Sequence, residues 1–401
     1  MEKKGIQDYG RANRAQEEYT KIYKKAPEGV SFTPYRVCPI GAHSDHQLGK
    51  ITGFALDKGI RMAYSAKVNG VIEIASLQFS KRAQWHIAMT PEKQSDWADY
   101  LRGATLSLSS RFPLHTGLAA VIDGELPIGG LSSSAAVTIT FLTSLCKVNG
   151  ITLKPSELIE IAKEAENKYV GVSCGKLDQS CEVYCRKDHL LYMDLQDDSY
   201  ELIPGACHMK PFKIAIFFSG IERALADSKF NMRVDECRSA AYALMAYSGA
   251  DYGKFGEANL RYVPYEEYLQ YKDRLPKPWA KRAEHWYTEY KRVEEGAKAW
   301  KEGNIEKFGK LSFESGNSSI VNWETGSPEL KLLYEIMTHT DGIYGGRFSG
   351  AGFKGCCMAL IDPDYEQSIL EKVEKEYTKV FPELAQSYSA YICDTANGVN
   401  I

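Results

Sequence analysis

The sequence lacks a long hydrophobic run. Its longest apolar-looking stretch, from Ala135 to Cys146, contains threonine and serine and is shorter than the ~20 residues that a membrane-spanning helix needs. The first residues, MEKKGIQDYG, contain no apolar segment of the kind found in signal peptides. With 44% hydrophobic and 25% charged residues, the composition is that of an ordinary globular protein. We therefore expect a soluble, cytoplasmic protein that makes no contact with membranes.

An excess of positive charge is also missing. The chain has 49 lysines and arginines against 52 aspartates and glutamates, which gives a net charge of -3. This balance provides no general attraction to nucleic acids or to anionic membranes. We expect a monomer with a small-molecule ligand and no nucleic-acid partner. An anionic ligand would need positive charge that is concentrated locally.

Closely spaced CxxC pairs are absent as well. The ten cysteines are scattered, which is typical of buried reduced thiols rather than of a disulfide framework. Cys181 and Cys185 are four residues apart and could share one face of a helix, but no second pair of ligands lies at zinc spacing. The cysteines therefore predict neither disulfides nor a structural metal.

A chain of 401 residues is long enough for two or three domains. Hydrophobic periodicity predicts helices over residues 11–26 and 96–109 and from the serines near 133 to Gly150, and strands within 30–80 and over 118–126 and 213–220. We place the division near residue 205, with one domain over residues 1–205 and a second over 206–401. The charged stretch between residues 252 and 309 predicts long helices whose charges face solvent.

A glycine- and serine-rich loop, PIGGLSSSAA from Pro127 to Ala136, leads into one of these helices. The free N–H groups and the positive dipole end of a helix N-terminus favour phosphate, and a serine hydroxyl there can also ligate a divalent cation. The loop therefore predicts a phosphate-binding site. Taken alone, it is also compatible with a plain serine N-cap after a glycine turn.

Two other nucleotide motifs are excluded. No G-x-x-x-x-G-K-[ST] pattern occurs, so the chain is not a Walker-type NTPase. Residues Gly350 to Gly355 match G-x-G-x-x-G, but the following CCMALID predicts a strand where a dinucleotide site requires a helix. We reject NAD as a ligand and leave open that this loop packs closely against another ligand or another loop.

Two further segments carry polar groups of interest. The first, RVCPIGAHSDH from Arg36 to His46, crowds an arginine, two histidines and an aspartate into a turn, as in small-molecule sites, although surface polarity with a salt bridge would look the same. The second, CGKLDQS from Cys174 to Ser180, contains Asp178. A single aspartate does not identify a site by itself.

Together and in this order, these segments resemble the GHMP kinases, and specifically their galactokinase branch. The resemblance also includes WADYLRG at 97–103, RVEEGAKAW at 292–300, SPEL at 327–330 and GGRFSGAGFKGCCMAL at 345–360. It implies an α+β, two-domain fold with a ribosomal-protein-like N-terminal α/β domain that contains a left-handed βαβ unit, a ferredoxin-like C-terminal domain and an active site in the cleft between them. The activity it implies is transfer of the γ-phosphate of ATP to the anomeric hydroxyl of a galacto-configured sugar.

The resemblance also implies roles for individual residues. Asp178 would accept the proton of the anomeric hydroxyl, and Arg36 would keep it ionised and neutralise charge on the transferring phosphoryl group. Ser134 and Glu166 would hold Mg²⁺, although Glu166 could instead be a charge on a helix surface. The residues expected to bind ATP are Gly129, Gly130, Leu131, Ser132, Ser133, Ser134, Ala135 and Trp97, of which Trp97 could equally be a core residue. The residues expected to bind the sugar are Ala42, His43, Asp45, Gly175 and Phe230.

The departures from the galactokinase pattern bear on the substrate. Galactokinases usually have a glutamate facing the sugar's 6-hydroxyl where this chain has Ala42. A glutamate would repel a carboxylate at C6, whereas alanine with two nearby histidines would tolerate it. The form RVCPIGAHSDHQ also resembles plant-type galacturonokinases. We therefore favour D-galacturonate over D-galactose as the substrate.

Further departures concern the rest of the pocket. Phe230 replaces an aromatic hydroxyl that touches the sugar in galactokinases, which suggests an altered pocket. Lys176 replaces an aliphatic residue and either pairs with a substrate carboxylate or points outward. The phosphate loop is one glycine shorter than P-x-G-G-G-L-S-S-S. A non-catalytic sugar sensor on the same scaffold is the remaining alternative, and the intact serine loop and Asp178 argue against it.

Overall fold

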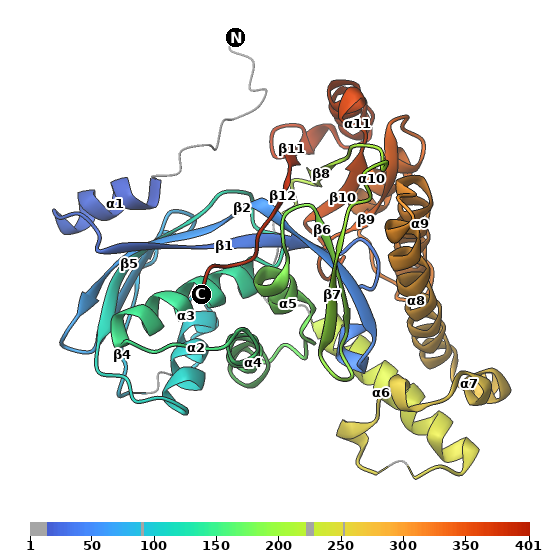
Figure 1. Ribbon diagram of the computed structural model, residues 1–401, viewed down its shortest axis with the longest axis horizontal. Helices are drawn as coiled ribbons and strands as arrows, with labels where there is room; N and C mark the ends of the chain where they lie inside the picture. Colours follow the sequence, from blue (N-terminus) through green and yellow to red (C-terminus); the bar gives the residue numbers. More distant parts are fainter. Residues whose placement is uncertain (1–13, 90–91, 222–227, 252) are drawn as a thin grey trace.

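Two β-sheets organise the chain, as Figure 1 shows for a computed structural model that describes residues 14–89, 92–221, 228–251 and 253–401. In the larger, eight-stranded sheet the long strand β2 pairs with β1, β5, β6 and β12. The strands of this sheet are β1 (Gly29–Val37), β2 (Lys50–Lys67), β3 (Val71–Ser76), β4 (Ala83–His86), β5 (Gly117–Gly124), β6 (His189–Asp194), β7 (Ser199–Pro204) and β12 (Thr395–Ala396). The parallel pairing of β3 with β5 makes a βαβ unit across helix α2 (Asp99–Ser109).

The second sheet is antiparallel and has the order β11-β8-β10-β9. Its strands are β8 (Lys213–Phe218), β9 (Ile343–Phe348), β10 (Cys356–Ile361) and β11 (Ser389–Cys393). Helices α10 (Pro328–Thr338) and α11 (Glu366–Val380) bury Leu330, Leu333 and Val373 in the core cluster that contains Phe217 of β8. This arrangement is the ferredoxin-like sheet with two helices that the sequence resemblance implies.

The other helices pack on the larger sheet, on one another or, as α9 does, on β9 of the second sheet. They are α1 (Arg14–Tyr23), α3 (Ser133–Asn149), α4 (Pro155–Glu164), α5 (Leu177–Tyr184), α6 (Ser228–Ser248), α7 (Tyr265–Tyr271), α8 (Lys277–Lys301) and α9 (Ile305–Val321). Short helices are η1 (Asp45–Gln47), the π-helical turn η2 (Ala165–Val170), η3 (Phe255–Glu257), η4 (Leu260–Tyr262), η5 (Lys272–Arg274), η6 (Pro363–Tyr365) and η7 (Pro382–Leu384). No helix within the described ranges is both long and apolar enough to cross a membrane.

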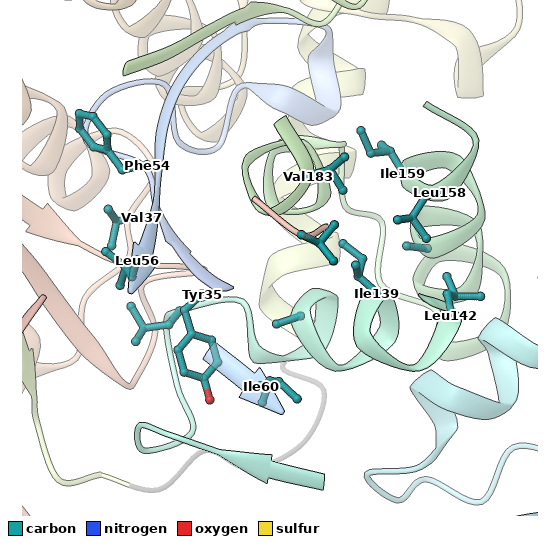
Figure 2. Close-up of a cluster of buried hydrophobic side chains, with 14 of the residues drawn as sticks. Tyr35, Val37, Phe54, Leu56, Ile60, Ile139, Leu142, Leu158, Ile159 and Val183 are labelled. Carbon is teal, nitrogen blue, oxygen red and sulfur yellow. The ribbon is translucent and has the colours of Figure 1, made fainter. Parts of the chain in front are cut away.

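The main hydrophobic core joins the larger sheet to the helices α2 to α5 and extends to α8, where the ring of Trp300 lies 5.2 Å from that of Phe54. Figure 2 shows part of it, with Val37 and Phe54 on the strands and Ile139, Leu158 and Val183 on the helices. Burying these side chains removes apolar surface from water at roughly 25 cal/mol per Å², which holds the helices against the sheet. The core thereby fixes the N-termini of α3 and α5, where the phosphate loop and Asp178 lie.

Most elements predicted from hydrophobic spacing are confirmed. Helix α3 ends at Asn149 and is followed by Gly150, whose φ of 63° is the left-handed conformation that glycine adopts without strain. Helix α1 confirms residues 14–23 of the helix predicted over 11–26, whereas residues 24–26 are not helical and residues 11–13 lie outside the described ranges. The strand predicted after the 350–355 glycines is β10. The ten cysteines are free thiols, and all except Cys174 and Cys207 are buried.

The proposed domain division near residue 205 falls between the two sheets along the chain. Strand β7 ends at Pro204, and β8 begins the second sheet at Lys213. The chain returns to the larger sheet at its end, where β12 pairs with β2 through Thr395 and Leu56. The division therefore stays a prediction.

Candidate active site

The centre of the candidate site is an ion pair between two residues that are 142 positions apart. The guanidinium of Arg36, on β1, donates from Nε and Nη2 to Oδ1 of Asp178, at 2.8 and 2.7 Å. Asp178 lies in the first turn of α5, and its side chain is 28% exposed, whereas that of Arg36 is 4% exposed. Burial opposes the charge on Arg36, but Asp178 outweighs it and raises the pKa of Arg36 above its ordinary value. The carboxylate is thus held beside a permanent positive charge and remains open to a ligand.

Arg36 also connects this pair to the phosphate loop. Its Nη1 donates to the carbonyl oxygen of Gly130 at 3.2 Å, so one guanidinium contacts both the proposed base and the loop. Such an arrangement places fixed positive charge where negative charge would develop during phosphoryl transfer.

The glycine loop at 350–355 packs directly on the phosphate loop. Gly130 has a φ of 87°, and a Cβ there would lie 2.7 Å from Cys356 Sγ and 3.0 Å from the Ser349 carbonyl oxygen. A Cβ at Gly350 would lie 2.8 Å from the Cα of Gly130. Only glycine permits this close approach of the two backbones. The sequence left open whether the 350–355 loop packs against a ligand or against another loop. The structure shows that it packs against the phosphate loop.

The N-terminus of α3 has the features of an anion site. Ser132 is its N-cap residue with a φ of 57°, but its hydroxyl does not cap the helix and, although buried, has no hydrogen-bond partner among the described residues. The predicted serine at the N-cap position is confirmed. The alternative of a plain serine cap is wrong for Ser132, because its hydroxyl makes no capping hydrogen bond. Ser349 Oγ is likewise buried and without a partner in the described chain. Unsatisfied hydroxyls beside free helix N–H groups fit a phosphate ligand.

The remaining loop residues differ in what they can offer. The side chains of Leu131 and Ala135 are buried in the core, so only their backbone atoms could contact a nucleotide. Ser133 and Ser134 are half-buried in the first turn of α3. Trp97 stacks on Phe79 with ring centroids 5.6 Å apart. Its contact with adenine stays a prediction.

Glu166 is buried rather than a charge on a helix surface. It lies in the π-helical turn η2 with 4% exposure, and Gln179 Nε2 donates to its Oε1 at 3.1 Å. No group of three or more His, Cys, Asp or Glu within the described ranges could hold a metal ion by itself. One carboxylate and one serine hydroxyl still fit Mg²⁺, which keeps several waters and takes phosphate oxygens as further ligands.

The predicted sugar residues gather around η1. Gly175 lies so close to Asp45 that a Cβ would be 2.5 Å from its Oδ2, and the backbone N–H of Leu177 donates to the same oxygen at 3.4 Å. The low exposure of Asp45 to water and the nearby charge of Asp178 raise the pKa of Asp45 to about 6. His46 meets the ring of Phe230 edge-on at 6.3 Å.

Both histidines of the segment from Arg36 to His46 have lowered pKa values and are neutral at pH 7. His43 stacks on Trp323 at 4.9 Å, and burial together with Arg347 lowers its pKa well below the usual value. Burial and the charge of Arg238 lower the pKa of His46 to about 3. The buried ring nitrogens His43 Nε2, His46 Nδ1 and His46 Nε2 have no partner in the described part of the chain. They can recognise hydroxyls by hydrogen bonding, but they supply no positive charge.

Sequence reasoning missed two residues that bind the backbone of Gly41 and Ala42. Glu289 on α8 accepts a 2.6 Å hydrogen bond from the backbone N–H of Gly41, and His285 Nε2 lies 3.0 Å from the carbonyl oxygen of Ala42. Both side chains are fully buried, so the expectation that the charges of this region face solvent is wrong for them. The available signal was their spacing of four residues, which places them on one helix face with buried Val293.

A cavity of about 330 Å³ lies beside the sugar residues. Asp45, His46 and Gly175 line it, together with the cationic residues Lys163, Lys176 and Arg238. Ala42 does not line this cavity, and its side chain packs in the core cluster that contains Leu177. The cavity therefore joins part of the predicted sugar site to a group of positive charges.

Comparison with known proteins agrees with the geometry. The family model for the GHMP kinases N terminal domain matches residues 93–186, and the GHMP kinases C terminal model matches residues 297–379. A galacturonokinase from Arabidopsis thaliana is 36% identical over 397 residues, covering 93% of each chain. A galactokinase from Clostridium beijerinckii is 30% identical and covers 96% of this chain and 98% of its own.

A solved structure gives the same result for the fold. The crystal structure of Lactococcus lactis galactokinase complexed with galactose matches with a TM-score of 0.86 at 26% identity, covering 96% of this chain and 98% of that one. The fold and the site thus define a phosphotransferase with an alcohol acceptor that uses ATP. The chain belongs to the GHMP kinases, in the branch that contains galactokinases and galacturonokinases.

Proposed function

We propose that this protein is an ATP-dependent sugar 1-kinase that transfers the γ-phosphate of ATP to the anomeric hydroxyl of D-galacturonate. The observation that carries the proposal is the Arg36–Asp178 ion pair, with Arg36 also bonded to the Gly130 carbonyl oxygen of the phosphate loop. A base and a fixed positive charge beside an anion-binding helix N-terminus are the parts that phosphoryl transfer requires. We also propose that the enzyme is cytoplasmic and monomeric.

The proposed chemistry assigns a proton and a bond change to named groups. The carboxylate of Asp178 takes the proton from the anomeric hydroxyl as that oxygen forms a bond to the γ-phosphorus. The bond between this phosphorus and the β,γ-bridging oxygen breaks, and ADP leaves. Arg36 orients the carboxylate and stabilises the charge on the phosphoryl oxygens. The backbone N–H groups at the start of α3, with Ser132 and Ser133, would hold the ATP phosphates.

Ser134 and Glu166 would hold Mg²⁺, which supplies charge neutralisation to the phosphates when bound. Gln179 fixes the orientation of the Glu166 carboxylate through its 3.1 Å hydrogen bond. The contribution of the chain is thus to position this carboxylate, because phosphoryl transfer leaves little covalent work to the protein.

The choice of galacturonate rests on the residues around the sugar. Ala42 leaves out the carboxylate that would repel a uronic acid, and a relative that is 36% identical is a galacturonokinase. D-galactose is the second candidate because the structurally similar Lactococcus lactis galactokinase was solved with galactose. The sequence argument is that alanine with two nearby histidines tolerates a carboxylate. Because both rings are neutral, they would donate hydrogen bonds to it and would not attract it by charge.

The test is a coupled ADP-release assay with MgATP and a panel of hexoses and uronic acids. We expect kcat/KM for D-galacturonate to exceed that for D-galactose. Ala42→Glu should reduce kcat/KM for galacturonate much more than for galactose, because the added carboxylate repels only the anionic sugar. Equal losses on both sugars would mean that residue 42 does not face C6, and a preference for galactose in the wild type would overturn the assigned substrate.

A further inference from the structure

The cavity next to Asp45 contains more positive charge than its own acids balance. Lys176 is neutralised by Asp198, whose Oδ2 lies 2.6 Å from its Nζ, and by Glu160. Lys163 also lines the cavity and makes no ion pair within the described ranges. Arg238 has one weak partner, Asp235, at 3.4 Å. The side chain of this aspartate is 62% exposed, and such a surface pair contributes little.

The two unbalanced cations come from two different helices that line the cavity. Lys163 lies on α4, which packs against the larger sheet's helices, and Arg238 lies on α6. The first turn of α6 is anchored over the cavity, since Asn231 Oδ1 accepts from the Ser173 N–H at 3.0 Å and its Nδ2 donates to the Gly171 carbonyl oxygen at 2.8 Å. Arg238 is therefore held near the sugar residues by a fixed helix rather than by a loop. This arrangement lowers the cost of ordering it around a ligand.

The only carboxylate among the lining residues of the described cavity is Asp45. Its Oδ2 accepts a 3.4 Å hydrogen bond from the backbone N–H of Leu177, and the carboxylate lies close to Gly175, on the side where sugar hydroxyls are expected. The neighbouring His46 is neutral and offers no charge to a ligand. An anionic group in this cavity would thus meet Arg238 and Lys163 as its partners. A neutral sugar would leave Lys163 without an acid and Arg238 with only the exposed Asp235.

We propose that Arg238, assisted by Lys163, binds the carboxylate of a uronic acid substrate and thereby determines the preference for a uronic acid over a neutral sugar. The inference rests on the proposed function and adds the residues that recognise the anionic group. A guanidinium suits this task because it can form paired hydrogen bonds to a carboxylate. Lys176 has no part in it, because its ammonium is held by two acids of the protein.

The test compares kcat/KM for galacturonate and galactose in Arg238→Gln. We expect the ratio of the two to fall about 10- to 150-fold, the range that a hydrogen bond to a charged group corresponds to. Lys163→Gln should lower the ratio less, and Arg238→Lys should retain part of it because the charge remains. Asp235→Asn is the matched control from the same helix, and it should keep or raise the ratio since it removes a competing acid.

A measurement without variants keeps the inference testable if Arg238→Gln does not fold. Raising the salt concentration should raise the KM of the wild type for galacturonate and leave that for galactose nearly unchanged, because salt screens only the charged pair. Calorimetric titration of both sugars separates binding from turnover. A wild type that binds galacturonate tightly without phosphorylating it would contradict the proposed function alone. A folded Arg238→Gln protein with the wild-type preference, or a KM for galacturonate independent of salt, would overturn the role of Arg238.

Discussion

The residues that we propose to face the sugar have pKa values that are shifted mainly by burial. His43 and His46 are neutral because burial and neighbouring cations lower their pKa values, whereas the pKa of Asp45 is raised to about 6. These shifts follow from partners that lie far away in sequence, such as Arg347 beside His43. The sequence therefore predicts which residue types form the proposed sugar site, but not their protonation.

Asp45 leads to a prediction about pH. Because its pKa lies near 6, this carboxylate takes up a proton as the pH falls below that value and then accepts fewer hydrogen bonds from sugar hydroxyls. We expect kcat/KM for the sugar to decrease below about pH 6 and to level off above pH 7, because kcat/KM reports groups of the free enzyme.

The control is Asp45→Asn, measured at the same saturating ATP concentration because the nucleotide phosphates also titrate. This variant should be less active and should lose the part of the profile that is due to Asp45. A wild-type profile that stays flat from pH 5 to pH 8 would contradict the assigned role.

Helix α8 has charged residues that face solvent and buried residues that contact the candidate site. Its buried Glu289 accepts from Gly41 and from Ser315 Oγ, and it pairs with Arg292 at 2.7 Å and Arg347 at 3.6 Å. Burial alone would raise the pKa of Glu289, but the surrounding cations lower it to about 2. The helix thereby fixes the backbone of Gly41 and Ala42, within the segment from Arg36 to His46.

Glu289→Gln should reduce the free energy of unfolding at pH 7 by about 3–5 kcal/mol, because it leaves buried cations without their counter-charge. The folded-state pKa is depressed, so this contribution is present above pH 4.5 and is lost as the pH falls toward 2. The difference between variant and wild type, measured by urea unfolding, should therefore shrink between pH 5 and pH 3.

Glu294→Gln on the same helix is the matched control. Its carboxylate pairs with Lys50 at 2.8 Å but is 47% exposed, so its loss should cost less than about 1 kcal/mol. Equal losses in the free energy of unfolding for the two variants would contradict the stabilising role assigned to buried Glu289.

The elements themselves were largely predictable. Helix α3, with serines before it and Gly150 after it, and strand β8 follow from local spacing and end signals. The buried face of α8 was not, because lysines and glutamates dominate its composition and tertiary contacts decide which of them are covered. The contact between the Gly130 and Gly350 loops joins segments 220 residues apart, and no local signal encodes it.

At the scale of the whole molecule, the site is assembled from both halves of the chain. Arg36 and Asp178 come from the larger sheet and its helix α5, whereas Phe230, Arg238 and Glu289 come from helices that follow residue 205. The family resemblance predicted that such distant segments meet, since several motifs in fixed order imply one fold. It did not predict the charged cavity, because Lys163 and Arg238 belong to none of those motifs.

The account depends most on Asp178 acting as the base beside Arg36. The most direct measurement follows wild type and Asp178→Asn with MgATP and galacturonate by phosphorus and proton NMR, with calorimetry to check that the variant still binds the sugar. We predict a product with phosphate on C1 for the wild type and a rate lower by roughly 10²- to 10⁴-fold for the folded variant. Phosphate on another carbon, or turnover of Asp178→Asn at the wild-type rate, would contradict the account.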